Sequence, residues 1–188
     1  MLHALSAFFY RIASWKTLLP GILLYPVIPV LVFAPLEARW NAYAGYAIGP
    51  IDLLVEFNPA KIQKMVADYG AENRSVYALT EMTADVIYPI IYTFLFCIIL
   101  SLLYRKRGAL AMSPVNVFPL TGLLLDYLEN VCIVTLLKLY PDPLPVVATL
   151  CSVLTNLKWA SFIVTGLLAV YGVIQLALRK PVAEKLSV

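Results

Sequence analysis

Apolar residues fall into four long runs separated by shorter polar stretches. The runs cover about residues 17–36, 84–104, 115–137 and 146–178. About twenty apolar residues cross the hydrocarbon core of a bilayer as a helix, so each run predicts one membrane span. The predicted fold class is all-α: an integral membrane four-helix bundle in which residues 1–188 form a single transmembrane domain.

Residues 37–80 are predicted to be an outer loop that is partly helical. Asn58 suits a helix N-cap, Pro59 the first helical position and Gly70 the position after a helix end. A short helix is therefore expected between Asn58 and Gly70. The segment 73–104 is expected to form one continuous helix that starts outside the membrane.

Basic residues are distributed unequally between the two sides that four crossings define. One side carries Arg11, Lys16, Arg105, Lys106, Arg107, Arg179, Lys180 and Lys185. The positive-inside rule then predicts a multi-pass protein of the cell (inner) membrane with both termini in the cytoplasm. Residues 1–16 suit a short helix in the cytoplasmic interface, with disorder as the alternative. A cleaved signal peptide is the alternative for the first run, although Pro35 and Glu37 make a poor cleavage site.

Composition agrees with a membrane protein whose main partner is the lipid bilayer. Hydrophobic residues make up 62% of the chain and charged residues 13%, whereas soluble domains carry roughly 25% charged residues. The net charge of +3 is modest and the basic residues flank the spans, so nucleic acid is not an expected partner. No cysteine belongs to a C-x-x-C pair, and His3 is the only histidine. Neither a thiol relay nor a metal site is predicted.

Charged residues inside the apolar runs identify the candidate site. Asp85 begins the second run, Asp126 and Glu129 lie inside the third, and Lys158 lies within the fourth, while Glu81 precedes Asp85 by one helical turn. Such residues are costly in a bilayer and usually face a bundle interior or a watery cavity. From a helix rise of about 1.5 Å per residue, Asp85 and Lys158 are expected at one level near the outer boundary, with the two acids of the third run deeper.

Helical spacing groups further polar residues with these charges. Residues three and four apart share a helix face, so three polar stripes are expected to converge in the outer half of the bundle and to open outward. Asp126 and Glu129 are the candidate acid–base or catalytic residues. The candidate ligand-binding residues are Arg74, Tyr77, Glu81, Asp85, Tyr88, Tyr92, Asn130 and Lys158. Trp159 is expected to be an interfacial anchor or a wall of the site.

Pro89 adds a local expectation to the second stripe. A helical proline does not donate to the carbonyl four residues earlier and clashes with it, and here that carbonyl belongs to Asp85. A kink that leaves a free acceptor beside an acid is expected, with a bend that has no further role as the alternative. Three acids against one lysine also leave negative charge uncompensated.

These residues resemble the pattern of a group of uncharacterised bacterial four-span membrane proteins. The matching elements are Tyr69-Gly70, Arg74, Tyr77, Asp85-x-x-Tyr88-Pro89-x-x-Tyr92, Asp126-x-x-Glu129-Asn130 and Thr155-x-x-Lys158-Trp159. The resemblance covers about residues 15–178 and implies the four-span architecture. Asn73 stands where glycine is expected before the arginine, and this departure leaves the charged residues unchanged.

Three functional hypotheses follow from the sequence. The first is a binding site for a small amphipathic or lipid-like ligand, with chemistry on the ligand left open and no cofactor identified. The second is a proton- or cation-coupled transporter that uses the same acids. Four spans without an inverted repeat are few for such a carrier unless it forms a homo-oligomer. The third is a structural or accessory membrane subunit in which the buried Lys–acid pairs fix the packing.

Overall fold

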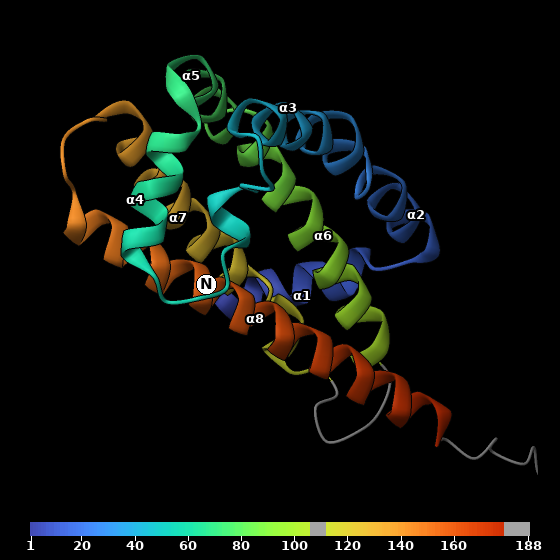
Figure 1. Ribbon diagram of the computed structural model, residues 1–188. Coiled ribbons are helices and arrows are strands. Elements are labelled where there is room, and N and C mark those ends of the chain that lie inside the picture. Colours follow the sequence, from blue (N-terminus) through green and yellow to red (C-terminus); the bar gives the residue numbers. More distant parts are fainter. Residues whose placement is uncertain (106–111, 179–188) are drawn as a thin grey trace, which may run out of the picture.

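The structure, a computed structural model, describes residues 1–105 and 112–178, and within them all of the regular secondary structure is helical. Four helical stretches are long and apolar enough to cross a membrane: Trp15–Ala44, Gly70–Tyr104, Pro114–Lys138 and Pro145–Ala177. These stretches lie side by side in an elongated bundle (Figure 1). The predicted all-α four-helix bundle is confirmed.

Three of the four stretches form the compact part of the bundle. Helix α6 (Ala84–Tyr104) packs against α7 (Leu120–Lys138) and α8 (Pro145–Ala177), and α7 and α8 form the most extensive helix pair. Glycines allow two close approaches: a Cβ on Gly122 would lie 2.9 Å from the Phe162 ring, and one on Gly172 would lie 2.9 Å from the Leu103 Cβ. Small residues are the usual means by which membrane helices approach one another.

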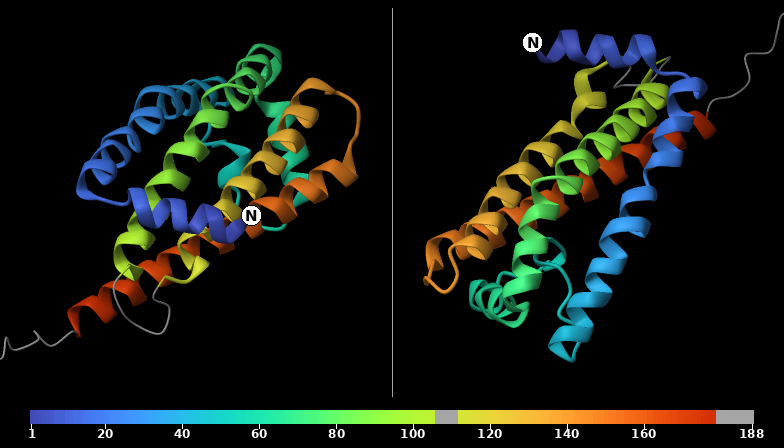
Figure 2. Two further views of the ribbon diagram at one scale, coloured as in Figure 1. Left: turned by 180° about the vertical axis from the view of Figure 1, so that it is seen from behind. Right: turned by 90° about the horizontal axis from the view of Figure 1, so that it is seen from above.

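The first helical stretch is packed more loosely than the others. It consists of α2 (Trp15–Leu24), the π-helical turn η1 (Pro29–Phe33) and α3 (Ala34–Ala44). Only 11% of its apolar window is buried, against 44% in the second and third stretches and 17% in the fourth. Helix α2 contacts α6, whereas α3 stands apart from α6 (Figure 2). One side of the bundle is therefore only partly covered.

The helix of this first stretch continues beyond the predicted end of the span at residue 36. Glu37, Arg39 and Asn41 are polar, but most residues of α3 are compatible with a helix, which ends where Gly45 adopts a left-handed φ of 76°. Polarity indicates where a span leaves the hydrocarbon layer, whereas helix propensity and the next cap decide where the helix stops. The irregular part of the predicted loop 37–80 is correspondingly shorter.

The remainder of that loop is a packed layer, which we call the loop end of the molecule. It contains η2 (Ile51–Leu53), α4 (Pro59–Asp68) and α5 (Gly70–Glu81). The Asn58 side chain accepts a hydrogen bond of 3.0 Å from the Lys61 amide, so the predicted N-cap is present. Helices α5 and α6 are separated at residues 82 and 83, so the helix expected to be continuous over 73–104 has a break.

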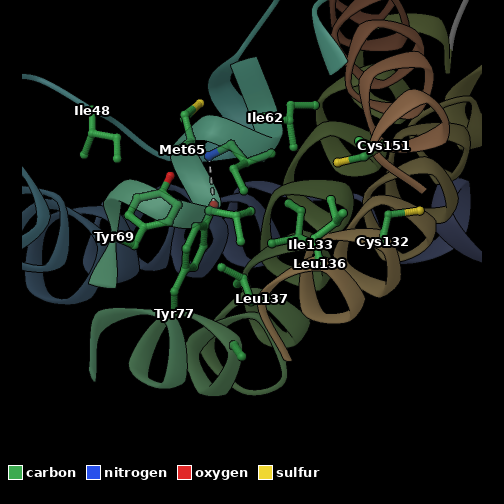
Figure 3. Close-up of a cluster of buried hydrophobic side chains, with 14 of the residues drawn as sticks. Ile48, Ile62, Met65, Tyr69, Tyr77, Cys132, Ile133, Leu136, Leu137 and Cys151 are labelled. Carbon is green, nitrogen blue, oxygen red and sulfur yellow. Dashed lines mark hydrogen bonds between the residues drawn. The ribbon is translucent and has the colours of Figure 1, made fainter. Parts of the chain in front are cut away.

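Buried apolar and aromatic side chains join the loop end to the bundle. Figure 3 shows Ile62, Met65 and Tyr77 among side chains of α7 such as Ile133 and Leu137. Trp40 of α3 stacks on Tyr77, with 4.3 Å between the ring centroids. The loop end is thus fixed to α7, α8 and the end of α3.

Helix α1 (Leu2–Ile12) lies across the opposite end of the bundle (Figure 2). The Ser6 hydroxyl donates to Asn116 Oδ1 at 2.6 Å, and the Asn116 amide donates to the Ser101 hydroxyl at 2.9 Å. The Arg105 guanidinium donates to the Ala13 carbonyl at 2.8 Å. The short helix expected within residues 1–16 is therefore present and fixed to the end of α6.

Candidate functional site

Charged side chains of α7 and α8 meet inside the bundle. Lys158 Nζ lies 2.5 Å from Glu129 Oε2 and 3.6 Å from Asp126 Oδ1. The Thr155 hydroxyl donates to Glu129 Oε1, and the Tyr92 hydroxyl of α6 donates to Asp126 Oδ2 at 2.6 Å. We call these five residues the charge cluster. The three stripes expected from helical spacing therefore do converge.

Lys158 lies deeper than counting along its helix suggested. It is beside Glu129, not level with Asp85. The Tyr104 hydroxyl, at the end of α6, donates to the Leu168 carbonyl at 2.7 Å, and α8 continues to Ala177. Because α8 extends past the end of α6, a count that starts at the end of α8 overestimates the height of Lys158.

A cavity of about 430 Å³ lies beside the charge cluster. Its walls come from the first helical stretch on one side and from α5, α6, α7 and α8 on the other. Tyr25 and Leu53 line the cavity and are 39% and 51% exposed, so the cavity reaches the surface beside the first stretch. The lining residues are Tyr25, Pro29, Phe33, Ala34, Glu37, Trp40, Pro50, Asp52, Leu53, Tyr77, Thr80, Glu81, Asp85, Tyr88, Tyr92, Phe96, Asp126, Lys158, Trp159 and Phe162.

Two lining acids, Glu81 and Asp85, lie where α5 meets α6, and we call them the cavity acids. Glu81 is 3% exposed, and within the described residues its Oε2 has no hydrogen-bond partner. Asp85 is 7% exposed and accepts a hydrogen bond of 2.8 Å from the Asn130 amide. Both acids are buried, but among the residues that the structure describes only Asp85 has a donor for its carboxylate.

Asn130 also changes the expectation for Pro89. The Asn130 amide donates to the Asp85 backbone carbonyl at 3.1 Å, the acceptor that Pro89 leaves without its helical donor. Helix α6 continues through Pro89. The expected free acceptor is therefore occupied by a side chain of the neighbouring helix.

The segment η2 covers the loop end of the cavity. The Ile51 amide donates to the Tyr77 hydroxyl at 2.9 Å, and that hydroxyl donates to Asp52 Oδ1 at 3.3 Å. The Trp159 indole donates to the Asp52 carbonyl at 3.0 Å. Trp159, expected to be an anchor or a wall, is a wall that also holds η2 in place.

Aromatic rings form the cavity wall below the acids. The Tyr88 ring lies 5.6 Å from Phe33 and 5.5 Å from Tyr92, and the Tyr92 ring lies 5.1 Å from Phe162, measured between centroids. Phe96 is eleven residues beyond Asp85 on α6, which a helix rise converts to roughly 16 Å. The cavity is therefore long: most of its carboxylates lie toward the loop end, and the rings of Phe96 and Phe162 lie toward the interior, beyond Asp126 and Lys158.

The predicted site residues fall into three groups. Tyr77, Glu81, Asp85, Tyr88, Tyr92, Asp126 and Lys158 line the cavity. Glu129 and Asn130 lie behind the wall, where they hold Lys158 and Asp85. Arg74 is placed elsewhere: its guanidinium lies 3.9 Å over the Tyr140 ring and donates to the Val66 carbonyl at 3.2 Å.

Sequence reasoning missed the half of the cavity that the first stretch and η2 supply. Glu37 and Trp40 are three residues apart at the end of an apolar run, so they share a helix face. This spacing could have indicated that the first stretch also contributes to the site. Asp52 stands between Ile51 and Leu53, but no periodicity indicates where such a loop folds back. Its position depends on the donors supplied by Tyr77 and Trp159.

Comparison with protein-family models, with curated proteins and with solved structures finds no match for this chain. The site is therefore interpreted from its own chemistry. In the described part of the chain, five carboxyl groups line the cavity, from Glu37, Asp52, Glu81, Asp85 and Asp126, together with one amine from Lys158. That amine is already paired with Glu129 behind the wall.

Proposed function

We propose that this chain is a multi-pass membrane protein that binds a small amphipathic or lipid-like ligand in the cavity beside the charge cluster. The observation that carries the proposal is the shape and polarity of that cavity. Its volume of about 430 Å³ falls in the range of roughly 300–1,000 Å³ that is typical of small-molecule sites. Most of the acids lie at one end and an aromatic wall extends from them toward the interior, which suits a molecule with a polar head and an apolar body.

The loosely packed first stretch supports entry from the side of the bundle. An apolar ligand dissolved in a bilayer reaches a site most directly between helices that are not tightly packed. Ala34 lines the cavity and is exposed. The gap bounded by the first stretch is the route that we assign to the ligand.

Binding, rather than catalysis, is the activity that the geometry supports best. Asp126 faces the cavity and accepts a hydrogen bond from Tyr92, so it is the residue best placed for acid–base chemistry on a bound molecule. Glu129 was an equal candidate from sequence, but its carboxylate is enclosed by Lys158 and Thr155. We assign Glu129 to the support of Lys158.

We further propose that both termini face the cytoplasm and that the loop end faces outward. Arg11, Lys16 and Arg105 lie at the end of the bundle that carries α1, where the positive-inside rule expects cytoplasmic charge. Lys106, Arg107, Arg179, Lys180 and Lys185, which contributed to this prediction, lie outside the described residues. At the loop end, several basic residues are paired with acids, as in Arg39–Glu72 at 2.5 Å and Lys61–Glu56 at 2.9 Å.

The orientation is tested by labelling. Cys97, Cys132 and Cys151 are buried, so an Ala71→Cys variant places a new thiol on the exposed surface of α5. In intact spheroplasts a membrane-impermeant maleimide should label this variant, with the wild type as the control. Labelling that appears only after lysis would overturn the proposed orientation.

Native mass spectrometry of gently purified protein tests ligand binding. The wild type should carry a bound mass, and Ala34→Trp, which fills the cavity mouth, should lose it. Ala38→Trp is the matched control, because Ala38 is exposed one turn further along the same helix and is not part of the cavity lining. Equal bound mass in both variants would place the molecule elsewhere on the protein.

A wild type that carries no bound mass and takes up no added amphiphile would overturn the binding proposal. Proton or cation flux in proteoliposomes, if it is abolished by Glu129→Gln, would then support a coupled carrier. Absence of both would support a structural subunit, for which the closed Glu129–Lys158 pair already provides one observation.

A further inference from the structure

We infer that the ligand of this cavity carries a positively charged amine group, which Glu81 and Asp85 hold at the loop end while the apolar body lies along the aromatic wall. The inference rests on the proposed binding function and specifies the class of head group. It follows from which polar atoms of the cavity are left without a partner, from its charge balance, and from the kind of rings beside the acids.

Glu81 provides the first argument. Its side chain lines the cavity, is 97% removed from solvent, and has a buried carboxylate oxygen that receives no hydrogen bond within the described residues. A buried carboxylate without a donor is among the most costly groups that a fold can contain. A donor that comes from outside the fold and occupies the cavity would remove this cost.

Charge balance provides the second argument. Asp85 lies one turn from Glu81, and its donor is the neutral amide of Asn130. The single cavity lysine, Lys158, lies 2.5 Å from Glu129 and 3.6 Å from Asp126. Within the described residues, the cation that lines the cavity is thus paired with acids of α7, and the acids at the α5–α6 junction have no basic partner. A cationic head group provides the missing charge, whereas an anionic one would add to the excess.

The aromatic residues beside the acids provide the third argument. Trp40 and Tyr77 line the same end of the cavity as Glu81, with their rings stacked at 4.3 Å, and Tyr88 follows Asp85 by one turn. Electron-rich rings next to carboxylates are the usual surroundings of organic ammonium groups in proteins. The buried Trp40 indole nitrogen also has no acceptor within the described residues, which suits an ammonium ligand that bears a hydroxyl or carbonyl oxygen nearby.

The test compares three amphiphiles with one chain length and different head groups: dodecylamine, dodecanol and dodecanoate. Binding to protein in uncharged maltoside micelles is followed by tryptophan fluorescence in a Trp15→Phe background. In that background the two remaining tryptophans, Trp40 and Trp159, both line the cavity. Dodecylamine should bind about ten times more tightly than dodecanol, which corresponds to roughly 1.4 kcal/mol, and dodecanoate should bind most weakly.

Variants assign the preference to the cavity acids. Glu81→Gln and Asp85→Asn should each reduce the affinity for dodecylamine by about tenfold and leave the affinity for dodecanol unchanged. Glu72→Gln is the matched control, because Glu72 is another glutamate of α5 but its side chain is 83% exposed. Elution of each variant as the same monodisperse species as the wild type shows that it is folded.

The outcomes separate this inference from the proposed function. Saturable binding of all three amphiphiles with equal affinity, or a preference for dodecylamine that survives both substitutions, would overturn the amine assignment and leave the binding site in place. The first of these results is also expected if the acids are simply protonated. Failure of all three amphiphiles to bind saturably would overturn the proposed function itself.

Discussion

The charge cluster and the cavity acids are equally buried but differ in what surrounds them. Glu129 and Lys158 are 0% and 3% exposed, and each has an oppositely charged partner within 2.5 Å. Glu81 is also 3% exposed, but its Oε2 faces no donor among the described residues. Burial alone therefore does not distinguish a structural charge from a functional one. The distinguishing property is whether the protein itself supplies an ion-pair or hydrogen-bond partner for the buried charge.

The difference follows from which helices supply each region. Helices α7 and α8 pack closely along the charge cluster, so a lysine on one meets the acids of the other directly. The cavity acids face the first helical stretch, which supplies aromatic rings and Glu37 but no cation to the cavity lining. The fold thus satisfies its charges where helices pack closely and leaves them unpaired where helices separate.

The largest effect is expected from removal of the cation of the charge cluster. Lys158→Met leaves Glu129 and Asp126 as buried acids without a counter-charge, a change that typically costs about 3–5 kcal/mol. The midpoint of thermal denaturation in detergent should fall by on the order of 10 °C. The double variant Lys158→Met/Glu129→Gln should recover much of this loss, because it removes the isolated carboxylate as well. A single variant as stable as the wild type would show that the pair does not hold the bundle together.

A smaller loss is expected at the single donor of the cavity acids. Asn130→Ala removes the hydrogen bonds to the Asp85 carboxylate and carbonyl, and removal of one hydrogen-bonding partner from a buried site costs about 1–3 kcal/mol. The thermal midpoint should fall by less than in Lys158→Met. Asn156→Ala is the control, since that amide donates to Ser152 within α8 at 2.8 Å. Equal effects of the two substitutions would argue against a special role for Asn130.

The cluster was more predictable from sequence than the cavity. Asp126, Glu129 and Lys158 interrupt apolar runs, and the cost of charge in a bilayer makes such residues visible in a single sequence. Helical spacing then identified the faces that meet. The bounds of α6, Ala84–Tyr104, agree with the predicted span for the same reason.

The second wall of the cavity could not be predicted in this way. Trp40, Asp52 and Phe33 belong to segments whose position depends on long-range contacts, such as the hydrogen bond from Trp159 to Asp52. Arg74 shows the converse limitation. It shares the spacing of the polar stripe, but its guanidinium lies over the ring of Tyr140 and donates to the Val66 carbonyl, so its side chain is not part of the cavity lining.

A matched pair of substitutions sharpens the comparison further. Glu81→Gln and Glu129→Gln both neutralise a buried glutamate, but Glu129→Gln removes the partner of Lys158, whereas Glu81→Gln removes a charge that the fold leaves unpaired. The thermal midpoint of the ligand-free protein should fall in Glu129→Gln and stay constant or rise in Glu81→Gln. Destabilisation of similar size in both would mean that the two regions are equivalent structural charges.

The smallest effect is expected at a charge pair outside both regions, which serves as the surface reference for the comparison. On α4, hydrogen bonds from Lys64 and Tyr46 lower the pKa of Asp68 below its usual range. A carboxyl with a lowered pKa in the folded state stabilises the protein above its ordinary pKa of about 3.9. This contribution is lost as the pH falls through the lower folded-state value.

The thermal midpoint of Asp68→Asn should therefore lie slightly below that of the wild type at neutral pH, and the difference should vanish in acid. Exposed charge pairs contribute little to stability. A loss of stability as large as that of Asn130→Ala would therefore show that exposed charge matters as much as buried charge. That result would contradict the distinction drawn between the two buried regions.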